Sequence, residues 1–326
     1  MSFPNIRMRR LRKTKNIRNM MQEIKLSSNN LILPIFIQEG INNAVPIPSM
    51  PDINRVSVAQ AVNEAKKAMS LNIPAVILFG IPSKKNQIGS SSYDKNGIIQ
   101  NAVKEIKKEL GEGLEIITDT CLCEYTSHGH CGVIKGEQLL NDDTLEILGK
   151  IAVSQAESGA DIVAPSGMID GQVKTIRNAL DKEGYSDTKI LSYSAKFASA
   201  FYSPFREAVK SIPQFGDRKN YQMNYSNPNE AMREIELDIQ EGADIIMIKP
   251  ALAYLDIIQK ARSLFNIPIA AYSVSGEYSL VKAASEKGWI NEKEIMLEII
   301  TAIKRAGANM IITNYAIELA NWLKNN

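Results

Sequence analysis

The feature of this sequence that most constrains its fold is a repeated alternation of short apolar segments with longer segments of helical periodicity. Eight segments rich in apolar and β-branched residues are typical of strands, and they cover 31–37, 75–79, 114–118, 161–164, 189–193, 244–248, 267–272 and 309–313. Helical periodicity is clearest in 58–71, where Ala61, Ala65 and Met69 recur every four residues, and in 142–158 and 229–241. Eight such units without a GxGxxG motif predict an α/β protein built as a (β/α)8 barrel, a TIM barrel.

A short phrase recurs at three of the predicted helix–strand junctions. It reads Ser-Gly-Ala-Asp-Ile-Val at 158–163, Glu-Gly-Ala-Asp-Ile-Ile at 241–246 and Ala-Gly-Ala-Asn-Met-Ile at 306–311. In each copy we expect the glycine to end a helix and the apolar residues to begin a strand. Because no linker divides the chain, we predict one catalytic barrel over residues 31–326, preceded by an extended N-terminal arm over residues 1–30.

Charge is distributed unevenly between the arm and the barrel. The chain has 38 basic and 36 acidic residues, a balance that gives no reason to expect polyanion binding. Seven basic residues nevertheless precede the first acid, Glu23, and they are Arg7, Arg9, Arg10, Arg12, Lys13, Lys15 and Arg18. Since no stacking aromatic residues are interleaved with them, we expect an arm that packs on a neighbouring subunit rather than a nucleic-acid tail. The sequence therefore predicts a homo-oligomer.

The sequence also bears on the cellular compartment. No apolar run approaches the roughly 18 residues that a membrane span requires. The first residues are charged rather than apolar, unlike those of a secretory signal. An odd, clustered set of three cysteines argues against a disulfide framework. We therefore expect a cytoplasmic protein that does not act at a membrane.

All three cysteines and both histidines of the chain lie within eleven residues, 121–131. Cys121, Cys123 and Cys131 form a Cys-x-Cys-x7-Cys arrangement. Structural zinc sites are normally closed by four protein ligands, whereas three ligands leave a position open for water or substrate. The alternative is three buried cysteines that act as small hydrophobic residues. The polar, glycine-containing segment favours a catalytic metal site.

Two lysines, Lys196 and Lys249, stand at or just beyond the ends of adjacent predicted strands. Catalytic residues of (β/α)8 barrels lie at these carboxyl ends. Two ammonium groups about 4 Å apart repel by roughly 4 kcal/mol at an effective dielectric constant near 20, which is enough to bring one lysine towards neutrality. A neutral lysine amine forms Schiff bases with carbonyl compounds. The alternative is that each lysine pairs with a carboxylate or reaches solvent, and the nearby thiol cluster makes the catalytic interpretation the better one.

The connection after Lys196, residues 197–222, is long and rich in aromatic residues, proline and glycine. Long loops over a barrel mouth commonly act as lids. Arg206 and Arg218 within it could bind a carboxylate in bidentate fashion. The alternative is a solvated loop with ordinary surface arginines.

Over essentially its whole length the sequence resembles the porphobilinogen synthase family, also called 5-aminolaevulinate dehydratase. The segments that carry the resemblance are Arg9-Arg-Leu-Arg12, Leu33-Pro-Ile-Phe36, Ser49-Met-Pro51, Leu78-Phe-Gly80, the cysteine loop, Ala164-Pro-Ser166, Ser192-Tyr-Ser-Ala-Lys196 with its lid, Met247-Ile-Lys-Pro250, Tyr254-Leu-Asp256 and Val274-Ser-Gly-Glu277. The family joins two molecules of 5-aminolaevulinate into porphobilinogen with loss of two waters. This reaction is an early step of tetrapyrrole and haem synthesis.

The resemblance implies a role for each matching residue. It implies that Lys249 forms the Schiff base with the substrate that supplies the propionate side, and that Lys196 tunes its charge and forms the second Schiff base. It implies that Asp119 and Ser166 assist proton transfer. The implied substrate-binding residues are Ser275 and Tyr315 for one carboxylate, Arg206, Arg218 and Gln222 for the other, and Tyr202 and Phe205 in the lid.

The resemblance also implies two metals and an assembly. Cys121, Cys123 and Cys131 would hold catalytic zinc, since the three thiols are kept where some family members have aspartates and use magnesium. Glu234 matches the ligand of a second, allosteric magnesium ion, although it could also be an ordinary acid on a helix surface. Members are usually homo-octamers whose N-terminal arms embrace their neighbours, which agrees with the basic arm.

The sequence departs from the family pattern at a few positions. Gly167 stands where the family usually has aspartate, Ile169 where it has methionine, Gln172 where arginine is common, and Ser203 where glycine is common. The loss of a carboxylate at Gly167 bears on zinc affinity and turnover. Two other interpretations are a class I aldolase on the same barrel, which needs neither the thiols nor a second lysine, and an inactive zinc-binding scaffold.

Overall fold

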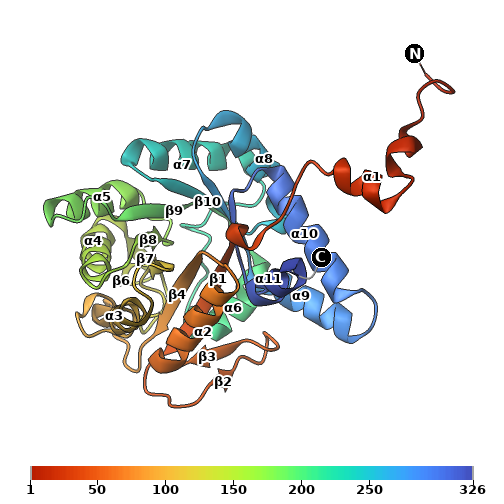
Figure 1. Ribbon diagram of the computed structural model, residues 1–326. Coiled ribbons are helices and arrows are strands. Elements are labelled where there is room, and N and C mark those ends of the chain that lie inside the picture. The colour runs from red at the N-terminus through yellow and green to blue at the C-terminus, as the bar shows by residue number, and fades with distance from the viewer. Residues whose placement is uncertain (1, 325–326) are drawn as a thin grey trace.

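The computed structural model describes residues 2–324, in which eight parallel strands close into a barrel (Figure 1). The barrel strands are β1 (Leu31–Gln38), β4 (Ala75–Ile81), β5 (Glu115–Thr120), β8 (Ile162–Pro165), β9 (Lys189–Lys196), β10 (Ile245–Lys249), β11 (Ile269–Ser273) and β12 (Met310–Thr313). Each strand pairs with the next along this order, and β12 pairs with β1. The predicted (β/α)8 barrel is confirmed, and all eight predicted strands are present.

Helices surround the barrel in Figure 1 and cover its outer face. They are α2 (Val58–Ser70), α3 (Ile98–Leu110), α4 (Asn141–Glu157), α5 (Gln172–Lys182), α7 (Pro228–Glu241), α8 (Leu255–Leu264), α9 (Ser275–Glu286), α10 (Glu292–Ala306) and α11 (Ala316–Lys324). The three helices expected from periodicity correspond to α2, α4 and α7. Within residues 2–324, none of the helices combines the length and the apolar character that crossing a membrane requires.

Helix α2 illustrates how the sequence sets a helix boundary and a buried face. The Ser57 hydroxyl accepts the N–H of Gln60, and the Gln60 side chain accepts the N–H of Ser57, which fixes the start of the helix. Ala61 and Ala65 are buried as the periodicity predicts, but Met69 is 37% exposed. A row of residues four apart drifts around a helix of 3.6 residues per turn, and so its last member leaves the buried face.

The repeated phrase marks the same structural device at three junctions. Gly159, Gly242 and Gly307 all have positive φ, of 99°, 103° and 130°, and each lies at a helix end as predicted. The Asp or Asn two residues after each glycine makes a side-chain hydrogen bond that could not be predicted from the sequence. Its side-chain oxygen accepts the N–H of a residue in the neighbouring strand, and these pairs are Asp161 with Ile116, Asp244 with Ile190 and Asn309 with Ile269. The phrase thus fastens adjacent barrel strands where they begin.

Short elements at the barrel mouth were not predicted. β2 (Val45–Pro46) pairs with β3 (Asn54–Val56), which pairs with β1 outside the barrel, and β6 (Val133–Lys135) pairs with β7 (Gln138–Leu140) after the cysteine loop. Segments of two or three residues are too short to show a periodicity.

The predicted bounds of one barrel strand, 189–193, ended too early. β9 continues to Lys196, because its last residues pair with β10.

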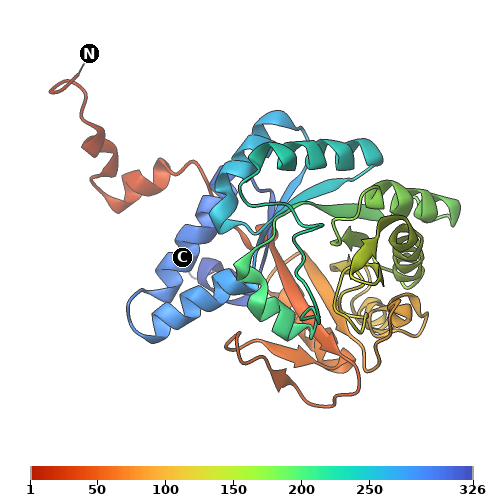
Figure 2. The ribbon, with the colours of Figure 1, turned by 180° about the vertical axis from the view of Figure 1, so that it is seen from behind.

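The lid, residues 197–222, leaves the barrel after β9 and returns beside it. It begins with the 3-10 helix η4 (Ala200–Tyr202) and the short helix α6 (Ser203–Ala208), and continues as irregular chain that runs across the strands in the view of Figure 2. The N–H of Ala198 donates to the carbonyl oxygen of Met223 over 2.8 Å, which joins the two ends of the lid.

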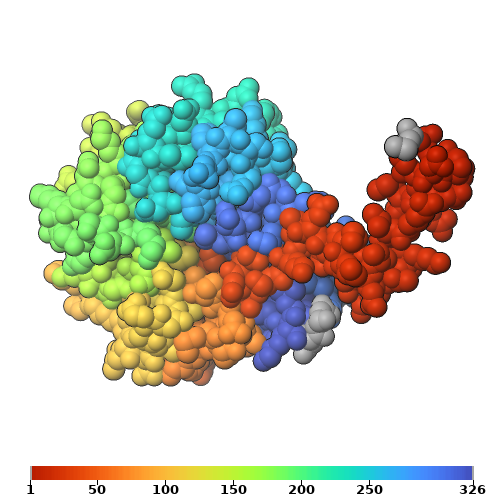
Figure 3. Space-filling view, turned by 45° about the horizontal axis from the view of Figure 1, so that its top comes forward, coloured from red at the N-terminus to blue at the C-terminus, as the bar shows by residue number. Residues whose placement is uncertain are grey.

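The N-terminal segment projects away from the barrel in Figures 1 and 3. It contains the 3-10 helix η1 (Met8–Arg12), the helix α1 (Lys15–Met20) and the 3-10 helix η2 (Ser28–Asn30), and none of the residues in these three helices is buried. Apolar side chains such as Phe3 and Met8 are 73% and 63% exposed. Apolar residues exposed on an extended segment are typical of a contact surface. Two further 3-10 helices are η3 (Ser90–Tyr93) and η5 (Leu252–Tyr254).

Candidate active site

Lys196 and Lys249 lie side by side as the last residues of β9 and β10. Both side chains are buried, with exposures of 5% and 3%. Lys196 Nζ donates a hydrogen bond to the carbonyl oxygen of Ser166 over 2.5 Å. Lys249 Nζ is surrounded by aromatic rings whose centroids lie at 4.2 Å for Tyr272, 4.7 Å for Phe205, 5.0 Å for Tyr193 and 5.5 Å for Tyr202. The sequence did not single out Tyr193 or Tyr272, because both belong to ordinary apolar strands.

The electrostatics of the two lysines differ from the expectation in one respect. Burial is the largest cause that lowers the pKa of Lys249, the positive charge of Lys196 is the second, and together they bring it to about 7. The sequence predicted a lowered pKa but attributed it to repulsion. Burial dominates because the aromatic enclosure, partly made by the lid, excludes water from the amine. The lowered pKa increases the share of the Lys249 amine that is neutral, and so nucleophilic, near neutral pH.

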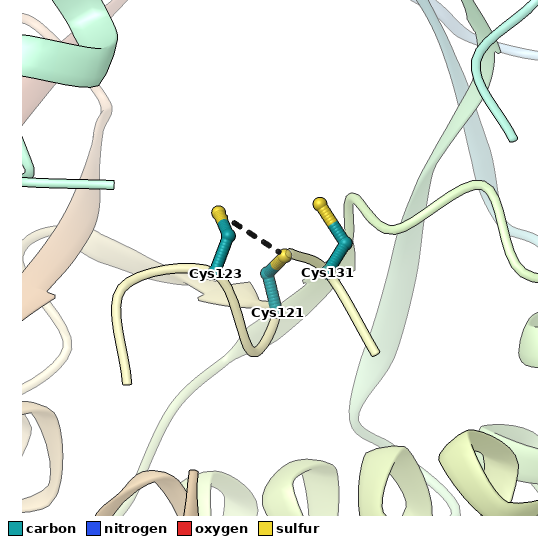
Figure 4. A group of neighbouring side chains, drawn as sticks. All are labelled: Cys121, Cys123 and Cys131. Atoms are coloured by element: carbon teal, nitrogen blue, oxygen red, sulfur yellow. Dashed lines mark hydrogen bonds between the residues drawn. The ribbon is translucent and has the colours of Figure 1, made fainter. Parts of the chain in front are cut away.

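The three thiols meet as the sequence predicts (Figure 4). The Sγ atoms of Cys121, Cys123 and Cys131 all lie within 4.8 Å of one another, and those of Cys121 and Cys123 are 3.6 Å apart. All three residues are buried. The loop that carries them starts directly after β5, at the carboxyl end of a barrel strand. Three converging sulfur donors fit a soft or borderline metal ion such as zinc and leave room for another ligand.

Glu124 is a residue of this site that the sequence analysis missed. It is 2% exposed, and its Oε1 accepts a hydrogen bond from the Cys123 thiol over 3.2 Å. Its other oxygen is buried without a hydrogen-bond partner among residues 2–324. Burial, followed by the charge of Cys123, raises the pKa of Glu124 to about 8. Glu124 is the only acidic residue between Cys123 and Cys131, and this position was the one sequence feature that could have pointed to it. Its burial depends on the folded loop.

The two histidines of the cysteine loop contact different segments, and His130 is the one whose ring joins the loop to the lid. The His130 ring contacts the Tyr221 hydroxyl and the Phe215 carbonyl oxygen, each over 3.1 Å, and thus touches the lid at two points. The His128 ring contacts the carbonyl oxygen of Gln87 over 3.0 Å. Burial lowers the pKa of both histidines, which favours their neutral form. Within the described part of the chain, neither histidine is grouped with the three thiols as a metal ligand.

The polar lid residues differ in whether their hydrogen-bonding groups are already used within the protein. Arg218 is buried, and its Nη2 donates to the carbonyl oxygens of Gly129 and Ser211, each over 2.7 Å. Arg206 is half-buried, and burial together with the charge of Arg218 lowers its pKa. Arg206 Nε and both amide atoms of Gln222 are buried and have no hydrogen-bond partner anywhere in residues 2–324. Buried polar groups without partners are rare, and at a barrel mouth they indicate a site for a polar ligand.

Ser275 and Tyr315, the other pair predicted to bind a carboxylate, also differ from each other. Ser275 is the first residue of α9, and its hydroxyl is buried with no partner in the described chain. The Tyr315 hydroxyl donates to Glu292 Oε1 over 2.9 Å and is therefore already engaged. Tyr202, predicted for the lid, donates its hydroxyl hydrogen to the carbonyl oxygen of Lys249 over 3.1 Å. Tyr202 thus anchors η4 to the strand end that carries this lysine.

Asp119 and Ser166 lie at the ends of the neighbouring strands β5 and β8. Burial raises the pKa of Asp119 well above its usual range, and the nearby charges of Glu124 and Cys123 act in the same direction. A carboxyl group that keeps its proton can donate it. Ser166 is buried, and its carbonyl oxygen holds Lys196 as described above. Both predicted residues therefore adjoin the lysine and thiol clusters.

The departures at Gly167 and Gln172 prove to be neighbours in space. A Cβ atom placed on Gly167 would lie 3.0 Å from Ile169 Cγ1, 3.5 Å from Gln172 Oε1 and 3.7 Å from the carbonyl oxygen of Cys131. The Gln172 side chain is buried and accepts the N–H of Ile169 over 3.4 Å. The two positions at which the resemblance led us to expect a charged residue thus lie close together beside the thiol loop.

Glu234 lies on α7, apart from the thiols. It lines a cavity of about 510 Å³ together with Asp170 and Glu230. Burial, followed by the charges of Asp238 and Asp170, raises the pKa of Glu234 to about 7. Among residues 2–324, Glu234 does not belong to a group of three ligand atoms close enough to hold a metal ion by themselves. A cation bound here would need water molecules to complete its coordination.

The chain is a closed (β/α)8 barrel whose mouth holds a buried lysine, a partner lysine and three converging thiols, which are the groups that imine chemistry beside a metal requires. The sequence matches the delta-aminolevulinic acid dehydratase family over residues 5–322. The chain belongs to this family and is accordingly a metal-dependent enzyme of the hydro-lyase class.

Individual relatives agree with this assignment over nearly the full length. The chain is 57% identical to the delta-aminolevulinic acid dehydratase of Archaeoglobus fulgidus over 322 residues, which covers 99% of both chains. It is 51% identical to that of Bacillus subtilis, with 97% of this chain and 98% of the relative covered. The solved structure of the Toxoplasma gondii enzyme in complex with its reaction product porphobilinogen superposes with a TM-score of 0.95 at 42% identity, covering 97% of this chain and 91% of that one.

Proposed function

We propose that this enzyme condenses two molecules of 5-aminolaevulinate into porphobilinogen with loss of two waters, as a step of tetrapyrrole synthesis. The observation that carries the proposal is the pairing of Lys249 with Lys196 at a mouth that also holds the three thiols. A class I aldolase would need one such lysine and no thiol cluster, and a zinc-binding scaffold would need neither lysine.

In the proposed reaction the neutral amine of Lys249 attacks the ketone carbon of the first substrate. The new carbon–nitrogen bond becomes an imine, and the ketone oxygen leaves as water. The low pKa of Lys249 supports this role, because a larger share of the amine is unprotonated at neutral pH. The rings of Tyr272 and Phe205 exclude water and so protect the imine from hydrolysis.

Lys196 holds its positive charge beside Lys249 and forms the second imine in this proposal. Asp119, which burial keeps protonated, delivers a proton to a departing oxygen, and Ser166 holds Lys196 through its carbonyl group. The reaction also requires a base that removes a proton from the substrate. Once Asp119 has given up its own proton, its carboxylate can act as that base.

The substrate carboxylates would bind at two places. Ser275 and Tyr315 are assigned to one, which is supported by the unpartnered Ser275 hydroxyl. Binding through Tyr315 requires its hydroxyl to leave Glu292. Arg206 and Gln222 are assigned to the other, with Arg218 supplying charge from a fixed position, because unpartnered donors are present on both. Tyr202 and Phe205 complete the apolar wall.

We assign zinc to Cys121, Cys123 and Cys131, because three buried thiols within 4.8 Å of one another form a soft donor set. When bound, zinc acts as a Lewis acid that polarises and orients the second substrate. When zinc is bound, Cys123 would be a thiolate, and Glu124, whose raised pKa favours its protonated form, would donate to that thiolate and help to fix its orientation. We assign an allosteric magnesium ion to Glu234, supported by the acids that raise its pKa, since a cation would relieve their repulsion.

We further propose that residues 1–30 form an arm for subunit contacts, that residues 31–326 form the catalytic barrel, and that the assembly is a homo-octamer. Support comes from the exposed apolar and basic side chains of the projecting segment. A cytoplasmic location is supported by three free, clustered thiols, which a reducing compartment preserves.

The proposal is tested by incubating the purified protein with 5-aminolaevulinate and following porphobilinogen by its colour with an aldehyde reagent. A parallel sample is treated with borohydride, and its peptides are mapped by mass spectrometry. We expect product and a reduced substrate adduct on Lys249. An adduct without product would favour an aldolase-like enzyme, and a zinc-binding protein with neither would favour the scaffold.

A further inference from the structure

A buried carboxylate, that of Glu277 on α9, joins the ends of two adjacent barrel strands. Glu277 is 2% exposed. Its Oε1 accepts the backbone N–H groups of Ala251 over 3.1 Å and Leu252 over 2.9 Å, just beyond the end of β10. Its Oε2 accepts the N–H of Val274 over 3.1 Å, just beyond the end of β11. One side chain therefore bridges two strand ends at the barrel mouth.

Both bridged segments carry residues of the site. Ala251 follows Lys249 by two positions, across a proline that has no N–H of its own. Val274 is the N-cap residue just before α9, and the next residue is Ser275, whose hydroxyl is buried without a partner in residues 2–324. Buried backbone N–H groups need acceptors, and hydrogen bonds to a carboxylate are stronger than those between neutral groups. The Glu277 carboxylate thus satisfies the donors that the two strand ends leave open.

We infer that Glu277 is a positioning residue, which fixes the separation between the Lys249 amine and the Ser275 hydroxyl by holding their two backbone segments together. The inference rests on the proposed function, with Lys249 and Ser275 both assigned here to the first substrate molecule. Imine formation requires the ketone carbon to stay within reach of the amine while the carboxylate of the same molecule is bound. A bridge that ties the two anchors to each other sets that distance, whereas two independent strand ends would let it vary.

The test compares Glu277→Gln with wild type by measuring the rate of borohydride trapping at Lys249 and, separately, KM and kcat for 5-aminolaevulinate. An amide of the same shape can accept at one end only, and its NH2 group faces N–H donors at the other end. We expect trapping to slow roughly 10- to 100-fold, the scale at which misplaced catalytic groups lose rate, and kcat/KM to fall with it. Bound zinc should stay unchanged, because no bond of Glu277 involves the thiols.

The matched control is Asn291→Ala, in the helix that follows. The Asn291 side chain accepts the N–H of Glu294 over 3.1 Å and caps the start of α10, as Glu277 caps the start of α9. Asn291→Ala therefore removes a helix cap without affecting the ends of β10 and β11. We expect a lower Tm with a wild-type trapping rate. Glu277→Asp keeps the charge on a shorter side chain and should recover part of the trapping rate, which also provides a second variant in case Glu277→Gln does not fold.

The outcomes separate this inference from the proposed function. A wild-type trapping rate in Glu277→Gln, or a loss that Asn291→Ala reproduces at an equal decrease in Tm, would overturn the positioning role alone. Absence of any adduct on Lys249 in the wild-type protein would overturn the proposed function and the inference with it.

Discussion

At the scale of single residues, the chemistry of the barrel mouth depends on how completely Lys249 is removed from water. Burial among four aromatic rings, followed by the charge of the neighbouring ammonium group, lowers its pKa to about 7. An amine with this pKa is nucleophilic under conditions in which a solvent-exposed lysine is almost fully protonated. The sequence indicated that two lysines meet, but it did not indicate the aromatic enclosure, because its members come from two strands and the lid.

The first prediction concerns the pH dependence of imine formation. Since only the unprotonated amine attacks the ketone, the trapping rate at Lys249 should rise with pH up to about 7 and level off above about 8. Lys196→Met removes a positive charge and should raise the pKa of Lys249, which moves this profile to higher pH. It should remain below the profile of a free lysine, because burial is the larger cause. Trapping rates between pH 5.5 and 9 provide the measurement, and an unshifted profile in Lys196→Met would contradict the charge coupling.

The second prediction concerns Gly167 and Gln172. Gly167→Asp would bury a carboxylate beside two oxygen atoms, Gln172 Oε1 and the Cys131 carbonyl oxygen, and it should destabilise the fold by roughly 1–3 kcal/mol. Adding Gln172→Arg supplies the opposite charge, so the double variant should be more stable than the sum of the two single changes by about 1 kcal/mol or more. Urea unfolding of the wild type, both single variants and the double variant measures this coupling. Additive free energies of unfolding would show that the two positions do not interact.

At the scale of secondary-structure elements, the lid is held by several contacts that the sequence does not reveal. The His130 ring, in the cysteine loop, contacts the lid residue Tyr221. Arg218, in the lid, donates a hydrogen bond to the carbonyl oxygen of Gly129, and Arg55, in β3, donates one to the lid. Arg55 Nε donates to the carbonyl oxygen of Ala208 over 2.7 Å and Nη2 to that of Glu207 over 2.9 Å. These are the last carbonyl groups of α6, the helix that carries Phe205 and Arg206, and cations at a helix C-terminus are stabilising.

The third prediction follows from the Arg55 contact. Arg55→Ala should loosen α6, raise KM for 5-aminolaevulinate roughly 10-fold and increase proteolytic cleavage within the lid, because Arg206 is no longer held in place. Lys66→Ala is a matched control, since it removes an ion pair with Glu109 in which both side chains are over 40% exposed and which contributes little. Limited proteolysis and steady-state kinetics of both variants check it. Equal KM values in the two variants would contradict a role of Arg55 in holding the lid.

The sequence predicts elements better than it predicts their contacts. Periodicity located all eight barrel strands, and motif spacing located the thiols and both lysines, because these signals are local. It missed β2, β3, β6 and β7, which are too short to have a period. It also missed Glu124 and Glu277, since a glutamate is ordinarily exposed and only the folded chain buries these two. Residues whose role depends on burial can be assigned only once the packing is known.

At the scale of the whole molecule, the barrel and the N-terminal segment differ in how they are stabilised. The barrel strands and the helices around them share one continuous core. The segment before β1 contributes no buried residue from its three short helices and projects from the molecule (Figure 3). A segment of this length with so few contacts to its own barrel is expected to find its packing partner on another chain.

The fourth prediction concerns this segment. Deletion of residues 2–13 should lower the mass of the assembly measured by sedimentation and leave the circular dichroism of the barrel unchanged, because no core residue is removed. A variant with Phe3 and Met8 both changed to serine should weaken the assembly in the same direction. An assembly of unchanged mass after the deletion would show that other surfaces hold the subunits together.

The central claim is that lysine chemistry and a thiol-bound metal act in one site to make porphobilinogen. The most direct measurement is porphobilinogen formation from 5-aminolaevulinate by the reduced protein, before chelation, after chelation and after zinc is restored. The account predicts product that disappears with the metal and returns with zinc, because the three thiols form a buried soft donor set. Product formation that is indifferent to chelation, in protein shown to be metal-free, would contradict it.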